Sequence, residues 1–257
     1  MRRSLHAEWT KLRTTNAPTW LFAATIVMTV AVGAIASASV HAQSSPGQDP
    51  VRLALTGVDL GQAIVAGLAV LTMCDEYATG MIHTTFLTVP RRLEVLAAKA
   101  GVLTFAVLLA GSAAVGASLL IGRSALAGNG FTSASGYRLI SIGDGPTLRA
   151  AGGSVLYLVL IGLLSLGVAT AVRDSTTGIG IVLGLLYLFP LLAALVSDPL
   201  WHHRLEQIGP TNAGQSIEAT TNLHNLALSP WNGLGVLAAW TTAALIIGGT
   251  LLVRRDV

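Results

Sequence analysis

AAGGSVLYLVLIGLLSLGVATAV, residues 150–172, contains no charged side chain. After Arg173 and Asp174 a second uncharged stretch, STTGIGIVLGLLYLFPLLAALVS, occupies residues 175–197. A helix of about 20 apolar residues crosses a hydrocarbon layer of about 30 Å, so each stretch is long enough to span a membrane. Because only Arg173 and Asp174 join them, we expect a tight antiparallel pair of helices.

Four more stretches pass the same length test. The six expected spans cover residues 20–40, 53–74, 100–122, 150–172, 175–197 and 231–253. Five contain no charged residue, and the second contains only Asp59. None shows the alternation over about ten residues that a membrane barrel needs, so helices are the remaining way to satisfy the backbone in lipid. The sequence therefore predicts an all-α, polytopic membrane protein with six transmembrane helices in one domain, residues 1–257.

The composition favours the same class. The chain has 257 residues, of which 53% are hydrophobic and 11% charged, and its mean hydropathy is +0.68. A soluble domain carries about 25% charged residues, so this chain has too few polar side chains to cover a water-facing globule. Cys74 is the single cysteine, which excludes a disulfide within the chain and a cysteine-based metal site.

The basic residues predict the orientation. If both termini lie in the cytoplasm, ten of the 15 lysines and arginines face inward, as the positive-inside rule favours. The inward ones are Arg2, Arg3, Lys11, Arg13, Arg91, Arg92, Lys99, Arg173, Arg254 and Arg255. The outward ones are Arg52, Arg123, Arg138, Arg149 and Arg204. We therefore expect a multi-pass protein of the plasma membrane with cytoplasmic N- and C-termini.

The N-terminal segment, residues 1–19, has a pattern of its own. Leu5, Trp9 and Leu12 recur at helical spacing, and Lys11 and Arg13 lie on other faces. This pattern predicts a short amphipathic helix in the cytoplasmic interface, anchored by Trp9, Lys11 and Arg13. Pro18 then allows a bend, and Trp20 marks the start of the first span. The alternative is a basic flank that only sets the topology.

The most polar patterned segment, EYATGMIHTTFLTVPRR, covers residues 76–92 within an expected cytoplasmic loop, 75–99. Its apolar residues recur at helical spacing, and Pro90 ends the pattern because proline cannot continue a helix. Arg91, Arg92 and Lys99 then suit an anionic membrane surface. The apolar stripe consists of Tyr77, Met81, Ile82, Thr85 and Phe86. We expect a short helix across the inner membrane face, with its ends fixed in two different spans.

Four segments carry a resemblance to a known family. They are HAEWTKLRT at residues 6–14, EYATGMI at 76–82, VPRRLEVLAAKA at 89–100 and SPWNGLGVLAAWTTAALIIGGTLLVRRD at 229–256. Their order around six spans resembles the permease subunits of type-2 ATP-binding-cassette exporters (the ABC-2 type), especially stand-alone bacterial permeases. The resemblance covers essentially the whole chain.

The resemblance implies roles that periodicity alone does not show. The N-terminal segment would be an elbow helix, and the loop after the second span would be a coupling helix that docks on an ATPase subunit. The implied contact residues are Glu76, Tyr77, Thr79, Gly80, Met81, Ile82, His83 and Phe86, with Arg91 and Arg92 as interfacial anchors. Two ATPase copies and a second permease, identical or related, would complete the complex. ATP and magnesium would bind the ATPase, and no nucleic acid is expected as a partner.

The residues are compatible with a separate energy source. A P-loop needs a glycine-rich turn ending in Gly-Lys-Ser/Thr, whereas Lys11 and Lys99 are the only lysines and neither follows a glycine. An intramembrane enzyme would need a nucleophile with a base, or clustered acids and histidines, and the spans contain one acid. We therefore expect a transport subunit for hydrophobic or amphipathic cargo (a drug, peptide antibiotic or lipid), with no catalytic, cofactor or metal site of its own. The alternative is a non-transporting membrane scaffold or sensor of the same fold.

A few residues inside the spans are candidates for a gate or a dimer interface. Asp59 is an ionisable residue within a span, and it suits either a gate or an interfacial partner of Arg52. Gly180 and Gly184 form a GxxxG face that allows close packing, although chance matches are common among 28 glycines. Pro190 is expected to kink the same span.

The predicted outer loops contain two further patterns. His202, His203 and His224 lack acidic or cysteine companions at a metal-site spacing. SIEATTNLHNLALSP, residues 216–230, is compatible with a short amphipathic helix at the outer surface.

Overall fold

The computed structural model describes residues 10, 16–42, 47–82, 91–137, 140–141, 143–196 and 198–255. Within these ranges the chain is helical and contains no strand. Six helical segments are long and apolar enough to cross a membrane, which is consistent with a multi-pass membrane protein; the predicted all-α class is confirmed for the described residues. The long helices are α2 (Asn16–Ser39), α4 (Val58–Ala78), α6 (Arg92–Gly128), α7 (Gly145–Val172), α8 (Ser175–Leu195) and α11 (Pro230–Arg254).

Each of these helices overlaps one expected span, but the bounds differ. The second spanning segment also includes α3 (Pro50–Leu55), so that it runs over Pro50–Ala78. The largest difference is at α6, which begins at Arg92 rather than residue 100 and continues to Gly128 rather than residue 122. Residues 75–78 and 92–99, expected in a loop, are therefore helical. A hydropathy criterion finds only the apolar part of a helix, whereas the backbone hydrogen bonds of α6 continue over about 55 Å at 1.5 Å per residue.

The start of α2 also differs from expectation. The helix begins at Asn16 and includes Pro18, two residues before the expected start of the span at Trp20. A proline in the first helical turn removes no intrahelical hydrogen bond, because the amide groups there have no partner within the helix. The remainder of the expected elbow helix lies outside the described residues, apart from Thr10, which is helical.

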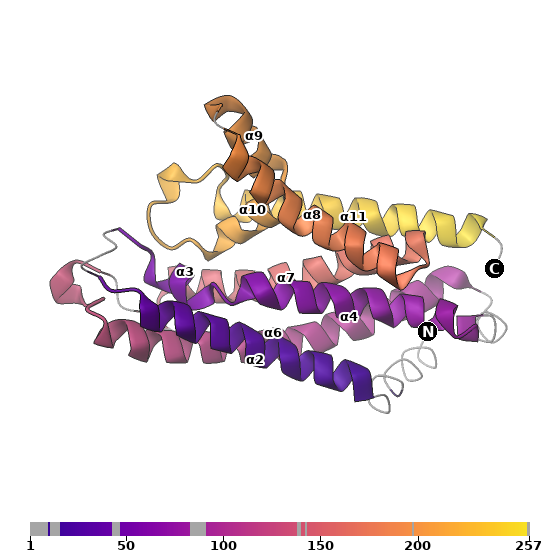
Figure 1. The fold of residues 1–257 in the computed structure, drawn as a ribbon, viewed down its shortest axis with the longest axis horizontal. Helices are drawn as coiled ribbons and strands as arrows, with labels where there is room; N and C mark the ends of the chain where they lie inside the picture. Colours follow the sequence, from indigo (N-terminus) through magenta and orange to yellow (C-terminus); the bar gives the residue numbers. More distant parts are fainter. Residues whose placement is uncertain are drawn as a thin grey trace.

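α7 is the centre of the bundle. It packs against α4, α6, α8 and α11, while α2 packs on α4 and α6 (Figure 1). In the most apolar stretch of 18 residues in α7, about 67% of the residues are buried, compared with 22% in the corresponding stretches of α2 and α8. The outer helices therefore present apolar side chains away from the protein, where a soluble bundle would present polar ones.

Close helix approach depends on glycine where α7 crosses α11. A Cβ atom at Gly248 would lie 2.4 Å from the Gly167 carbonyl oxygen, and one at Gly167 would lie 2.6 Å from the Ala244 carbonyl carbon. Only a residue without a side chain fits at either position. α11 can therefore lie directly against the backbone of α7.

The two ends of the bundle have different structures. At the Arg254 end, α4, α7 and α11 finish and α6 and α8 begin. At the Glu218 end lie α3, α9 (Pro199–Ile208), α10 (Pro210–Gln215) and three short 3-10 helices. The 3-10 helices are η1 (Ser133–Ser135), η2 (Ser216–Glu218) and η3 (Leu223–Asn225). Figure 1 shows α9 extending sideways from the bundle, beyond the end of α8.

The α7–α8 joint is the tight antiparallel turn that the sequence predicts. Arg173 ends α7 with φ 65°, a left-handed conformation that most residues avoid. Asp174 then accepts a hydrogen bond from the Thr177 amide at 2.7 Å and caps α8. Hydrogen bonds from Thr177 also hold the pKa of the exposed Asp174 carboxyl below its usual value.

The segment SIEATTNLHNLALSP differs from the expected amphipathic surface helix. It forms η2 and η3 separated by residues 219–222, which are not helical, and its first part is buried rather than at the surface. Ile217 is fully buried against Gly153 of α7, where a Cβ atom would lie 2.0 Å from the Ile217 side chain. The amphipathic pattern therefore reflects insertion between helices at the Glu218 end.

Candidate functional site

The connection between α4 and α6 begins with a defined turn at the Arg254 end. α4 ends at Ala78, and Thr79 donates its backbone N–H to Asp75 at 3.0 Å. Gly80 follows with φ 70°, a conformation that favours glycine, and donates to Tyr77. Met81 and Ile82 are helical again. Residues 76–78 of the polar segment thus belong to α4, and a glycine turn separates them from Met81 and Ile82.

A buried ion pair ties the two helices that flank this connection. The Lys99 ammonium lies 2.7 Å from a Glu76 carboxylate oxygen, and it also donates to the Thr72 carbonyl at 3.1 Å. Lys99 is 2% exposed and Glu76 is 7% exposed. Removing either charge would leave the other in a poorly solvating environment, so the pair couples α4 to α6.

Arg92, the first residue of α6, joins that helix to α11. Its guanidinium donates to the Leu252 carbonyl at 2.9 Å and to the Arg255 carbonyl at 2.6 Å. The carbonyl groups in the last turn of a helix have no partner within it, so an arginine is well suited to satisfy them. Arg255 in turn donates to the Ala171 carbonyl at 3.1 Å, near the end of α7.

A cation–π contact completes the arrangement. The Arg173 guanidinium lies 5.2 Å from the centre of the Tyr77 ring, which connects the α7–α8 turn to the last turn of α4. The α4–α6 connection is therefore flanked by side chains whose contacts reach the ends of α11 and α7 and the α7–α8 turn. We call this set the Arg254-end network: Glu76, Tyr77, Arg92, Lys99, Arg173 and Arg255.

The predicted partner-contact residues fall into three groups. Thr79, Gly80 and Met81 are exposed, and Tyr77 is half-buried. Glu76 and Ile82 are buried, so their side chains contact the protein itself rather than offering a surface to a partner. This corrects the expectation for both residues, because helical spacing alone does not tell which face is covered. His83 and Phe86 lie outside the described residues.

The predicted interfacial anchors divide similarly. Arg91 is exposed and pairs with Glu94 at 3.1 Å, whereas Arg92 holds the end of α11. Trp9, Lys11 and Arg13 lie outside the described residues. Lys99, expected at the membrane surface, is buried instead. Its burial results from the contact with Glu76 of α4, 23 residues earlier, which no local sequence pattern indicates.

Asp59 lies at the Glu218 end, in the first turn of α4. Its carboxylate accepts a hydrogen bond from the Gln215 amide, and its backbone carbonyl accepts one from the Tyr187 hydroxyl at 2.6 Å. The structure thus joins Asp59 to α10 and α8. Asp59 is thus an exposed residue with specific partners at the Glu218 end of the bundle.

The candidate dimer-interface residues lie on α8. Gly180 and Gly184 are exposed, and a Cβ atom at either would meet nothing within 4 Å. The two glycines therefore do not mediate packing within the described chain, and they remain candidates for contact with a second copy. Pro190 lies inside α8, and the kink expected there stays a prediction.

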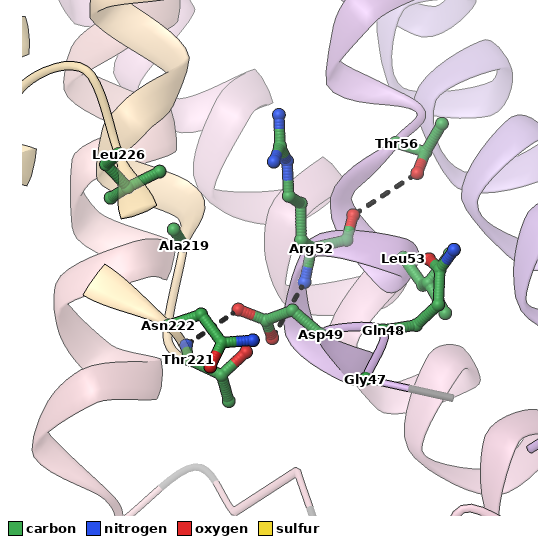
Figure 2. A pocket seen from close by; sticks show the side chains of 10 residues that line it. All are labelled: Gly47, Gln48, Asp49, Arg52, Leu53, Thr56, Ala219, Thr221, Asn222 and Leu226. Carbon is green, nitrogen blue, oxygen red and sulfur yellow. Dashed lines mark hydrogen bonds between the residues drawn. The ribbon is translucent and has the colours of Figure 1, made fainter. Parts of the chain in front are cut away.

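A cavity of about 470 Å³ opens at the Glu218 end between α3 and the residues that follow η2. Figure 2 shows the Asp49 carboxylate facing the backbone of Arg52 and Thr221, while the Arg52 guanidinium points away from it. Asp49 serves both as the N-cap of α3 and as an acceptor for Thr220 and Thr221. Its carboxylate is therefore engaged in holding the wall of the cavity.

Glu218 is the residue at this end that sequence reasoning missed. It is 5% exposed, and the Ser154 hydroxyl of α7 donates to its carboxylate at 3.0 Å. Burial raises the pKa of the Glu218 carboxyl to about 8. No local pattern distinguishes it from a surface glutamate, because its burial results from contacts with residues far away in the sequence.

The histidines show local contacts. The His202 ring lies 2.8 Å from the Ala193 carbonyl, and His203 contacts Gln207 at 3.0 Å. Among the residues that the structure describes, no group of three or more His, Cys, Asp or Glu side chains could hold a metal ion.

Comparison of the sequence with protein-family models and with curated proteins found no match.

Proposed function

We propose that the chain is the membrane-spanning permease subunit of an ATP-driven exporter of the type-2 ATP-binding-cassette class. A separate pair of ATPase subunits would supply the energy, and a second permease copy would complete the pathway. The cargo would be hydrophobic or amphipathic. The resemblance of four sequence segments supports this proposal, together with six helices long and apolar enough to cross a membrane.

The observation that carries the proposal is the Arg254-end network around the α4–α6 connection. Thr79, Gly80 and Met81 are exposed there, directly beside the buried Glu76–Lys99 pair. A soluble partner bound to these exposed residues would displace the ends of α4 and α6 together. Arg92 and Tyr77 would carry the displacement to α11 and to the α7–α8 turn. This is a physical route by which nucleotide binding on a partner could bias two arrangements of the bundle.

The test combines photo-crosslinking in membranes with an ATPase assay of the purified proteins. A photo-crosslinking residue at Met81 should capture a P-loop ATPase encoded by the same organism, identified by mass spectrometry from gently solubilised membranes. The matched control is the same residue at Ser133, which is exposed at the opposite end of the bundle and should not crosslink to it. The purified pair should hydrolyse ATP in liposomes, and Met81→Glu should weaken both the crosslink at Thr79 and the ATPase activity.

A stable chain that never captures an ATPase from Met81, under several detergents, would contradict the exporter proposal. It would favour the scaffold or sensor alternative, which requires no ATP-hydrolysing partner.

A further inference from the structure

The Glu218 end of the bundle is closed by a buried segment that is not a spanning helix. This capping segment, residues 209–222, comprises α10, η2 and the residues on either side. Thr211, Ala213, Ile217 and Ala219 are each less than 5% exposed. The segment contacts α3, α7, α8 and α11, and it lies between elements that are distant in the sequence.

Five polar anchors attach the capping segment to the bundle. Gln215 donates to Asp59 of α4, and the Ser154 hydroxyl of α7 donates to Glu218. The Thr211 hydroxyl donates to the Leu186 carbonyl of α8 at 2.8 Å. The remaining two use the backbone of the segment. Arg149 of α7 donates to the Ala219 carbonyl, and the amides of Thr220 and Thr221 donate to Asp49 before α3.

Glu218 is the only ionisable residue of the capping segment, as the sequence of residues 209–222 shows. A buried carboxylate needs several hydrogen bonds or a close cation to compensate for lost hydration. Ser154 is the one side chain that donates to Glu218 among the described residues. The neutral, protonated acid is therefore better suited to this position than the carboxylate.

The surrounding charges act in both directions. The negative charges of Asp59 on α4 and of Asp49 before α3 disfavour a second negative charge, whereas Arg52 on α3 favours it. From α7, the Tyr157 hydroxyl interacts electrostatically with Glu218. Arg149, also of α7, donates to the carbonyl of Ala219, the residue that follows Glu218. α8 contributes Tyr187, which bonds Asp59, and α11 carries no ionisable residue except Arg254 at the other end. Burial outweighs the favourable contacts, which raises the pKa of the carboxyl.

We propose that Glu218 is a proton-binding site that controls how firmly the capping segment is held in the end of the bundle. The seated segment takes up a proton that the exposed segment releases. Deprotonation at higher pH therefore favours release of the segment and opens this end of the bundle to water. The proposal is independent of the transport function, because it requires only the described residues of this chain.

The direction of the pH dependence follows from the two protonation constants. The pKa of the carboxyl is about 8 when seated and near its ordinary 4.5 when exposed. The proton contributes its full stabilisation of the seated state below about pH 4.5, and this stabilisation is lost progressively up to about pH 8. The equilibrium constant for opening should rise about tenfold per pH unit within that window and level off above it.

Hydrogen–deuterium exchange of the full chain in lipid nanodiscs measures this opening. Exchange of peptides from residues 209–222 would be followed from pH 5 to pH 9 and corrected for the intrinsic pH dependence with unstructured peptides of the same sequence. We expect the corrected opening to follow the profile above. Glu218→Gln, which keeps the shape of the neutral acid, should give a flat profile. Glu206→Gln, the matched removal of an acid from α9, should leave the profile unchanged.

Two further variants test the surrounding charges and donors. Ser154→Ala removes a hydrogen bond that favours the carboxylate. The pH at which the opening constant levels off (the levelling point) should therefore be higher in this variant. Asp59→Asn keeps an oxygen acceptor for Gln215 but removes a negative charge, so the levelling point should move to lower pH. A flat wild-type profile, a pH-dependent Glu218→Gln profile, or shifts of both variants in the same direction would overturn the proposal. Unchanged exchange of α7 peptides serves as the check that each variant is folded.

Discussion

At the scale of single residues, Lys99 and Glu76 have the most demanding environment at the Arg254 end. Their side chains are buried between α4 and α6, at a contact distance of 2.7 Å. A pair of this kind is weak evidence for net stability, because desolvation offsets much of the attraction. Its effect is specificity, because the pair holds the ends of α4 and α6 in one relative position.

Lys99→Met tests this dependence. The variant removes the ammonium 2.7 Å from the buried Glu76 carboxylate, and the free energy of unfolding should fall by about 3–5 kcal/mol. Glu76→Met should have a similar cost, whereas the double variant should recover most of the loss because no charge remains buried. The measurement is unfolding of the purified chain in mixed micelles, arranged as a double-mutant cycle. Strictly additive losses would show that the two charges do not depend on each other.

At the scale of elements, the crossing of α7 and α11 depends on backbone contact. Gly167 and Gly248 face each other there, and neither leaves space for a methyl group. In lipid, apolar side chains gain little by association with one another, so close packing of helix backbones contributes more of the stability. The Arg254-end network can join α11 to α6 and α7 only if this crossing is maintained.

Gly248→Ala should therefore weaken the α7–α11 contact. The added Cβ atom would meet the Gly167 carbonyl oxygen at 2.4 Å, and separating the helices should cost about 1–3 kcal/mol. Gly235→Ala is the matched control on the same helix, because its Cβ atom would meet nothing within 4 Å. The control should be neutral or stabilising by up to about 1 kcal/mol, since alanine favours helix. Thermal unfolding of both variants in the same detergent provides the comparison, and equal losses would contradict the packing explanation.

At the scale of the whole molecule, the bundle has two chemically different ends. The Arg254 end holds arginines that bind helix carbonyls, and the Glu218 end holds the capping segment with its acid and amide groups. The positive-inside rule predicts the Arg254 end in the cytoplasm and the Glu218 end outside. On this topology, the residues proposed to bind a partner and the proposed proton site face opposite compartments.

Cysteine accessibility tests this orientation in intact cells. Single cysteines are introduced by Thr79→Cys or Ser133→Cys in a Cys74→Ala background, because both positions are exposed and lie at opposite ends. A membrane-impermeant maleimide should label the Ser133→Cys variant directly, and the Thr79→Cys variant only after the membrane is permeabilised. The reverse pattern would show the opposite orientation and would place the proposed ATPase contact on the wrong side.

The sequence alone predicted the helical class and the six spans because these depend on local properties. An uncharged run such as residues 150–172 must form a helix in lipid, whichever neighbours it acquires. The short joint at Arg173 and Asp174 similarly implied an antiparallel pair. Helix ends were less predictable, since α6 continues to Arg92 through residues that are individually polar or charged.

The candidate sites depended on contacts between distant residues, and only the tertiary structure decided them. Lys99 has the appearance of a surface anchor until Glu76, 23 residues earlier, is placed beside it. Glu218 has the appearance of a surface acid until α7 and α11 pack against its segment, with Ser154, 64 residues away, as its donor. Hydrophobic length is a property of one segment, and the sequence determines it. The burial of a charge is a property of everything packed around it, and therefore appears only when the helices are assembled.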